Sequence, residues 1–121
     1  MKAYHYTFLG EDYRVGFYFS RYQFNGNLYV GLINLDDEED PYFTDLTINI
    51  LILQPFAATI DDHLDSNICN WLESIGAGQT YEHKIRSNYG EYPVFQFDPE
   101  FLEQANPESF ARLCHSLNSS E

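Results

Sequence analysis

The segment from Tyr13 to Tyr22 alternates between apolar and polar side chains, with the apolar residues 15, 17 and 19 on one side. A period of two is typical of a strand with one buried face. Asn25-Gly26-Asn27 follows, and both residue types tolerate the positive φ that a tight turn needs. We therefore expect Leu28 to Asn34 to form the second arm of a β-hairpin.

Three further segments are predicted to be strands: Tyr4 to Leu9, Phe43 to Leu53 and Tyr92 to Phe97. Aromatic and β-branched residues, which favour strands, are frequent in them. Pro55 ends the longest of the three, because proline has no N–H for a sheet ladder. Gln79 to Gly90 is polar and irregular, and it is interpreted either as a long loop or as an edge strand.

A helix is predicted after Asp65-Ser66-Asn67, because these residue types cap helices and an apolar stripe at helical spacing follows. The stripe consists of Ile68, Trp71, Leu72 and Ile75. Gly76 or Gly78 would end the helix by adopting the left-handed conformation. Asp61, Asp62 and Asp65 lie just before the helix, where its dipole favours negative charge.

Two more helices are predicted near the C-terminus. Asp98 can cap the first, and Pro99 suits its first turn. Its inward residues would be Phe101 and Leu102. Asn106-Pro107 starts the second helix, whose apolar stripe consists of Phe110, Leu113 and Leu117.

A chain of 121 residues with 44% apolar content has the size and composition of one packed domain, here residues 1–121. The order of the elements predicts the α+β class. We expect an antiparallel sheet of about four to five strands with about three short helices packed on one face.

Several features favour a cytoplasmic protein with reduced thiols. The segment from Met1 to Tyr6 lacks the apolar stretch of a signal peptide. The longest apolar run, Ile48 to Leu53, is too short to span a bilayer. Cys69 and Cys114 are far apart in the sequence and match no metal-binding spacing, so we expect neither a disulfide nor a metal site.

Negative charge is large and concentrated. Nine of the nineteen carboxylates lie between Asp36 and Asp65, which contains no Lys or Arg, and the net charge is −13. Charge of this sign repels nucleic acid and attracts basic surfaces. Asp36 to Asp40 is a run of five acids, which we expect to form a solvated, extended loop because like charges repel.

This run of five acids has two interpretations. It can serve solubility alone, as most charge runs do. Alternatively, folded carboxylates can imitate DNA phosphates, which duplex DNA presents at about one per 1.7 Å of axis. Calcium binding is disfavoured, because the spacing of an EF-hand loop is absent and consecutive residues of an extended chain point in opposite directions.

The sequence offers few candidates for catalysis. Glu82-His83-Lys84 has the Glu-x-Lys triplet of restriction-type nucleases, with Asp61, Asp62 or Asp65 as a further metal ligand. The segment around it does not resemble a strand, and so acidic a nuclease would repel its substrate. His115 and Cys114 are neighbours on a predicted helix, so their side chains diverge. We expect no enzyme activity, no catalytic residue and no cofactor.

The order of several landmarks resembles an uncharacterised family of small acidic proteins carried by conjugative elements, plasmids and prophages of gut bacteria. The landmarks are Asn25-Gly26-Asn27, Phe43 to Asn49, Asn67, Trp71, Ser87, Gly90 and Tyr92 to Asp98. The family is a domain of unknown function, so it implies no catalytic residue. It does imply a genomic setting in which inhibitors of restriction or CRISPR nucleases are often encoded.

We therefore expect a non-enzymatic protein-binding module that inhibits a nucleic-acid-binding host defence enzyme, of the anti-CRISPR or antirestriction type, by DNA mimicry. The residues expected to bind the partner's basic groove are Asp36, Asp37, Glu38, Glu39, Asp40, Tyr42, Asp45, Asp61, Asp62 and Asp65. Tyr42, Tyr81 or Tyr89 would be aromatic anchors. We expect no direct binding of nucleic acid and no membrane association. The alternative is a structural or regulatory accessory protein of the mobile element, with its charge serving solubility.

Overall fold

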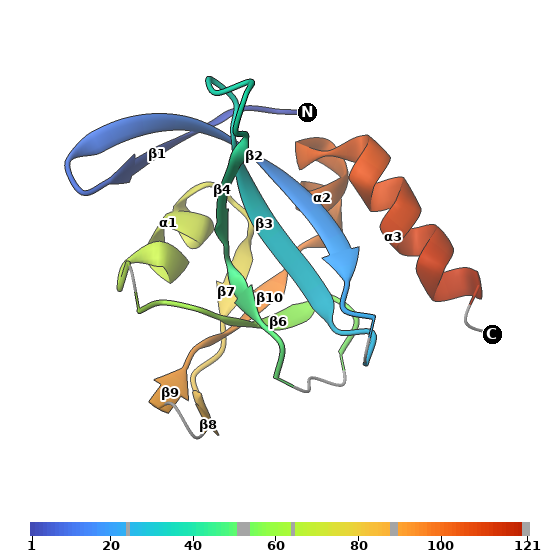
Figure 1. The fold of residues 1–121 in the computed structure, drawn as a ribbon. Coiled ribbons are helices and arrows are strands. Elements are labelled where there is room, and N and C mark those ends of the chain that lie inside the picture. The colour runs from blue at the N-terminus through green and yellow to red at the C-terminus, as the bar shows by residue number, and fades with distance from the viewer. Residues whose placement is uncertain (24, 51–53, 64, 88–89, 120–121) are drawn as a thin grey trace.

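The computed structural model describes residues 1–23, 25–50, 54–63, 65–87 and 90–119, with the backbone alone for 116–119. Figure 1 shows the helices and strands of these residues. The strands are β1 (Tyr4–Phe8), β2 (Glu11–Arg21), β3 (Leu28–Asn34), β4 (Tyr42–Asp45), β5 (Thr47–Ile48), β6 (Ala57–Ile60), β7 (Gly78–Thr80), β8 (Ile85–Ser87), β9 (Gly90–Tyr92) and β10 (Val94–Phe97). The helices are α1 (Ile68–Ser74), α2 (Pro99–Ala105) and α3 (Pro107–Ser119).

The strands of the described residues form two four-stranded sheets and one hairpin. The first sheet has the order β1-β2-β3-β4, the second has the order β5-β6-β10-β7, and β8 pairs with β9. Every pairing is antiparallel. The α+β class is confirmed, and the strands that the sequence suggested for one sheet are divided between two.

The predicted hairpin is confirmed. β2 and β3 pair from Val15 opposite Asn34 to Arg21 opposite Leu28. The Tyr22 N–H donates to the Asn27 carbonyl at 2.9 Å and closes the turn. Gly26 has φ of 74°, a left-handed conformation that glycine adopts without steric cost.

The prediction of a single strand from Phe43 to Leu53 is wrong, because the chain passes from one sheet to the other at Leu46. β4 pairs with β3 in the first sheet, and β5 pairs with β6 in the second. Between them, the Leu46 N–H donates to the Val30 carbonyl, and the Leu46 carbonyl accepts from the Asp61 N–H, both at 2.9 Å. Leu46 is therefore hydrogen-bonded both to β3 of the first sheet and to the residue that directly follows β6 of the second. Residues 51–53 lie outside the described residues.

The sequence also failed to predict β6. All four of its residues are buried, and it lies inside the second sheet between β5 and β10. A short strand with no exposed face shows no alternation, so periodicity does not reveal it. The predicted strand from Tyr92 to Phe97 is interrupted at Pro93, where β9 ends and β10 begins. The segment from Gln79 to Gly90 contributes to β7, an edge strand, and contains β8.

The three predicted helices are confirmed. Gly76, with φ of 83°, follows α1 in the left-handed conformation. Asn67 occupies the N-terminal cap of α1 without a side-chain bond, while the Asp65 carboxylate accepts from the Asn67 N–H at 2.9 Å. Asp98 caps α2 by accepting from the Glu100 N–H at 3.0 Å.

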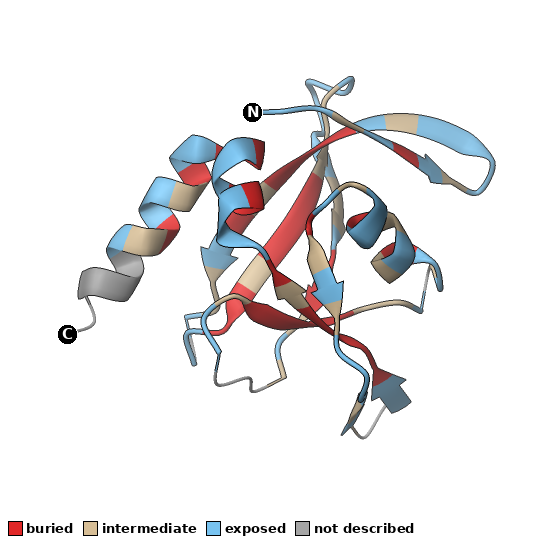
Figure 2. Ribbon diagram, turned by 180° about the vertical axis from the view of Figure 1, so that it is seen from behind, coloured by how far each residue is buried: buried red, intermediate tan, exposed pale blue. Residues whose placement is uncertain are grey.

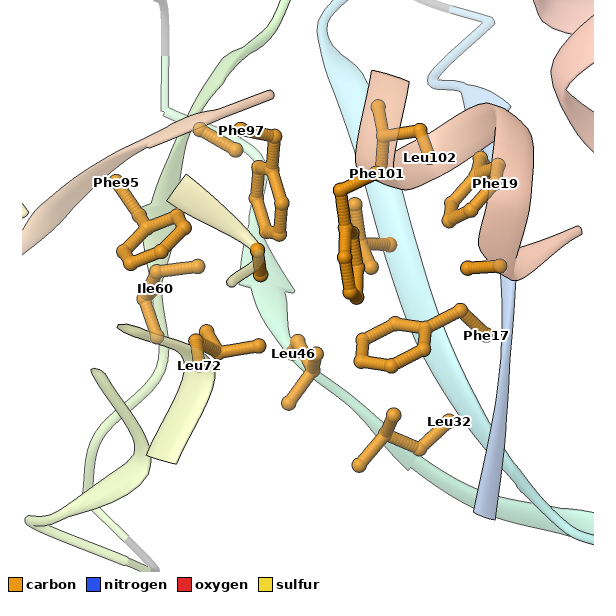
Figure 3. Packing of buried hydrophobic residues seen from close by; sticks show 14 of the residues in the cluster. Phe17, Phe19, Leu32, Leu46, Ile60, Leu72, Phe95, Phe97, Phe101 and Leu102 are labelled. Carbon is orange, nitrogen blue, oxygen red and sulfur yellow. The ribbon is translucent and has the colours of Figure 1, made fainter. Parts of the chain in front are cut away.

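Aromatic and aliphatic side chains from both sheets and the helices fill one core (Figure 3). Phe17 of β2 meets Phe101 of α2 edge to face, with ring centroids 5.4 Å apart. α2 and α3 pack against β2, and α1 packs against β7. Figure 2 shows that buried residues concentrate on the central strands and the inner faces of the helices. Leu113 of α3 is buried as predicted, while the Leu117 side chain lies outside the described residues.

Buried hydrogen bonds attach α3 to β2. The Ser109 hydroxyl accepts from the Phe19 N–H at 2.8 Å and donates to the Phe19 carbonyl at 2.9 Å. The Asn106 amide donates to the Phe17 carbonyl at 2.9 Å. The two Ser109 bonds satisfy the backbone N–H and carbonyl of Phe19, a buried residue of β2. They therefore fix the position of α3 along that strand.

Candidate functional site

The acidic loop, residues 36–41, connects β3 to β4, and all five of its acidic residues are exposed. It is compact, and the prediction of an extended loop is wrong. The Asn34 N–H donates to the Pro41 carbonyl at 2.7 Å and closes the loop. The Asp37 carboxylate accepts from the Asp40 N–H at 3.0 Å. These bonds hold adjacent acids together despite their repulsion.

A single cation pairs with the acidic loop among the described residues. The Arg14 guanidinium of β2 lies 3.0 Å from the Asp36 carboxylate, and the Arg14 carbonyl accepts from the Leu35 N–H at 2.9 Å. Asp37, Glu38, Glu39 and Asp40 form no ion pair with the described Lys, Arg and His side chains. Four exposed acidic residues of the loop therefore lack an ion-pair partner within the part of the chain that the structure describes.

β4 leads from the acidic loop to a cluster of tyrosines around Asp45. The Tyr29 hydroxyl donates to the Asp45 carboxylate, and the hydroxyls of Tyr18 and Tyr29 are 2.6 Å apart. Burial, followed by the hydrogen bond with Asp45, raises the pKa of Tyr29 above its ordinary value. A Cβ at Gly31 would lie 2.6 Å from the Tyr18 ring, so the absence of a side chain there makes room for the cluster. Tyr42, at the start of β4, is 57% exposed.

A cavity of about 200 Å³ lies between β1, β2, β4 and the start of α1. We name it the aromatic cavity after its walls, which include Tyr6, Phe8, Tyr13 and Phe43. Figure 1 shows α1 beneath the β1–β2 hairpin and beside β4. Residues of these elements line the cavity. The Tyr13 and Phe43 rings meet with centroids 4.8 Å apart, and Tyr6 meets Phe43 edge to face at 6.0 Å.

Acidic residues lie beside these aromatic rings. Asp45, Asp61 and Asp65 all line the aromatic cavity, although the Asp45 carboxylate is bound by Tyr29. The Asp65 carboxylate accepts from the Tyr6 hydroxyl at 2.5 Å. Burial, followed by this hydrogen bond, raises the pKa of Tyr6 above its ordinary value. Within the described residues, none of these three aspartates forms an ion pair.

Tyr13 lies between the aromatic cavity and the acidic loop. It lines the cavity, and it also lines a second hollow that includes Arg14 and Asp36. β4 also connects the acidic loop to the aromatic cavity. The chain from Pro41 to Asp45 advances by four residues and spans roughly 13 Å at about 3.3 Å per residue. The structure thus divides the predicted partner-binding acids into two neighbouring groups.

Asp36 to Asp40 form the first group, and Asp45, Asp61 and Asp65 belong to the second. Asp62 is half-buried and does not line the cavity. The aromatic walls of the cavity were not predicted from the sequence. A signal was present, because Tyr4, Tyr6 and Phe8 are spaced two apart and share one face of β1.

The other predicted residues lie elsewhere. The Tyr81 hydroxyl contacts Gln54 and Gln96, outside both groups of acids, and Tyr89 lies outside the described residues. Glu82 and Lys84 connect β7 to β8 and lie on no strand, so they lack the context of the nuclease triplet.

The described residues contain neither a metal-binding cluster nor a membrane-spanning helix. Their His, Cys, Asp and Glu side chains include no group of three placed to hold a metal ion. None of their helices has the length and apolar character needed to cross a membrane.

Comparison with known proteins identifies a family. No curated protein and no solved structure matches the chain. Residues 17–117 match the model of the family described as Domain of unknown function (DUF4313). The resemblance to an uncharacterised domain family is thereby confirmed, and the chain belongs to the DUF4313 family.

Proposed function

We propose that this protein is a non-enzymatic, cytoplasmic binding module of a mobile genetic element. It would occupy the basic groove of a nucleic-acid-binding host defence enzyme, of the CRISPR or restriction type, and inhibit it by DNA mimicry. The observation that carries the proposal is the compact acidic loop, with four exposed carboxylates that form no ion pair among the described residues.

The charge and the rigidity of the acidic loop both favour this role. A phosphate mimic needs several negative charges close together, since duplex DNA carries about one per 1.7 Å of axis. A disordered acidic run would lose conformational entropy on binding, whereas a loop closed by the Asn34–Pro41 and Asp37–Asp40 hydrogen bonds is already ordered. Association driven by these charges would be fast and would weaken as salt is added.

Tyr42 would add to the acidic loop an aromatic contact with the partner that salt does not screen. It directly follows the acidic loop and is 57% exposed. A tyrosine ring next to exposed carboxylates can pack against the partner while the charges meet Lys and Arg. The alternative, that the charge serves solubility alone, predicts that no partner depends on the loop.

Affinity capture with an isosteric loop variant distinguishes these functions. The variant carries Asp36→Asn, Asp37→Asn, Glu38→Gln, Glu39→Gln and Asp40→Asn, which removes the charge and keeps a side-chain oxygen at position 37 for the Asp40 N–H. A control variant carries Glu82→Gln, Glu100→Gln and Glu103→Gln, which are exposed acids elsewhere.

Tagged wild-type protein and each variant would be immobilised as bait and incubated with a lysate containing restriction and CRISPR effectors. The bait would then be washed at low and at high salt. We expect wild type and control to retain a nuclease that high salt elutes, and the loop variant to lose it. Retention of the same nuclease by the loop variant would contradict mimicry by this loop. Capture of element-encoded proteins alone would favour the accessory role.

A further inference from the structure

The aromatic cavity is lined on several sides by rings that remain partly accessible. Phe8, Tyr13 and Phe43 are half-buried, whereas Tyr6 is only 4% exposed. The rings come from β1, β2 and β4, and edge-to-face contacts between them fix their orientations. An aromatic face carries partial negative charge and attracts a cation within about 6 Å of its centre.

The carboxylates at the cavity add to this negative potential. Asp65 receives hydrogen bonds from the Tyr6 hydroxyl and the Asn67 N–H, and Asp61 receives one from the His63 N–H at 3.1 Å. All these donors are neutral, so they orient the carboxylates without cancelling their charge. The Lys2 ammonium lies over the Tyr4 ring, 5.4 Å from its centre. Tyr4 does not line the aromatic cavity, so this cation contacts a ring outside the cavity walls.

The size of the cavity limits what it can hold. About 200 Å³ is less than the roughly 300–1,000 Å³ typical of small-molecule sites. A nucleotide or a large cofactor therefore exceeds it. One long side chain suits the space, particularly one with an apolar stem to pack on the rings and a cationic end to meet the carboxylates.

We propose that the aromatic cavity receives one Lys or Arg side chain of the protein partner. This inference rests on the proposed function, because it takes the partner's surface to be basic. The stem packs against Phe43 and Tyr13, and the cationic group meets Asp61 and Asp65. The cavity would supply a specific anchor beside the acidic loop, whose charges act over a longer range.

Small capped amino acids test the cavity without the partner. The probes are the N-acetyl, N-methylamide derivatives of arginine, lysine and norleucine, the last being a neutral analogue of the lysine stem. Binding is followed through the backbone amide NMR shifts of Thr44 and Ile68, which line the cavity. Fluorescence of Trp71, 4.7 Å from the Tyr6 ring, is a second readout. We expect saturable shifts with arginine or lysine and much weaker ones with norleucine.

The double variant Asp61→Asn and Asp65→Asn removes both charges and keeps oxygen acceptors for His63, Asn67 and Tyr6. It should bind the cationic probes about tenfold more weakly, whereas the isosteric loop variant should bind them nearly as wild type does. Equal binding of norleucine, no binding of either cation, or unchanged affinity in the double variant would each overturn the cavity proposal.

The two proposals can fail separately. Probe binding at the cavity together with loop-independent capture of the nuclease would contradict the loop mimicry and leave the cavity site standing. Loop-dependent capture without probe binding would overturn the cavity site and leave the proposed function standing.

Discussion

The Tyr6 hydroxyl donates to the Asp65 carboxylate at 2.5 Å and joins β1 to the residues just before α1, 59 positions later in the chain. Tyr6 also packs 4.7 Å from Trp71 of α1. The Trp71 indole N–H in turn donates to the His5 carbonyl at 2.9 Å. These contacts fix α1 beneath β1 and so form one side of the aromatic cavity.

Removal of the Tyr6 hydroxyl should weaken this attachment. Tyr6→Phe keeps the ring and loses the bond to Asp65, so we expect the free energy of unfolding to fall by about 1 kcal/mol. Tyr13→Phe is the matched control, because its hydroxyl bonds Glu11 at an exposed position and should matter less. Urea denaturation measures both. Equal stabilities of Tyr6→Phe and wild type would show that the bond contributes nothing net.

Leu46 should be among the most sensitive positions of the core. It is 2% exposed and lies where the chain passes from one sheet to the other. Leu46→Ala would leave a cavity at this junction and should cost about 2–5 kcal/mol in a denaturant titration. Leu9→Ala, at a residue that is 85% exposed, should change stability little. A loss at Leu46 no greater than that at Leu9 would contradict this description of the junction.

The Ser109 hydroxyl should make a large contribution to the free energy of unfolding for so small a group. Ser109→Ala would leave the N–H and carbonyl of buried Phe19 without their side-chain partner, and we expect destabilisation of about 1–3 kcal/mol. Ser20→Ala removes an exposed hydroxyl from the neighbouring position of β2 and is the control. Thermal unfolding would compare the two. Similar melting temperatures for both variants would refute a structural role for the Ser109 bonds.

Alkaline pH should unfold the protein. The pKa values of Tyr6 and Tyr29 are raised above the ordinary 10.0, first by burial and then by hydrogen bonds to Asp65 and Asp45. The fold therefore favours the neutral phenols, and this stabilisation is present below pH 10.0 and is lost as the pH rises toward the higher folded-state values. Tyrosinate absorbance and circular dichroism should show some tyrosines ionising only as structure is lost. Ionisation of all ten with the fold intact would contradict this.

Local signals in the sequence predicted the elements that depend on neighbouring residues. The β2–β3 hairpin follows from alternation and from Gly26, and α2 follows from Asp98 and Pro99. In each case, the residues that determine the element lie within or next to it.

The change of sheet at Leu46 and the aromatic cavity could not be predicted in this way. Leu46 bonds Val30 and Asp61, which are distant in the sequence, and a run of β-branched residues does not reveal which sheet it joins. The cavity likewise depends on packing between strands, since Phe43 meets Tyr13 of β2. The acids were found from their charge, but their division into two groups depends on the tertiary fold.

Inhibition of the captured nuclease, measured as a function of salt, is the decisive test of DNA mimicry by the acidic loop. We predict that wild-type protein competes with DNA, that inhibition weakens steeply as salt rises, and that the isosteric loop variant inhibits at least about tenfold less at equal salt. The loop variant should retain the circular dichroism spectrum of wild type. Inhibition by the folded loop variant equal to that of wild type would contradict DNA mimicry by the acidic loop.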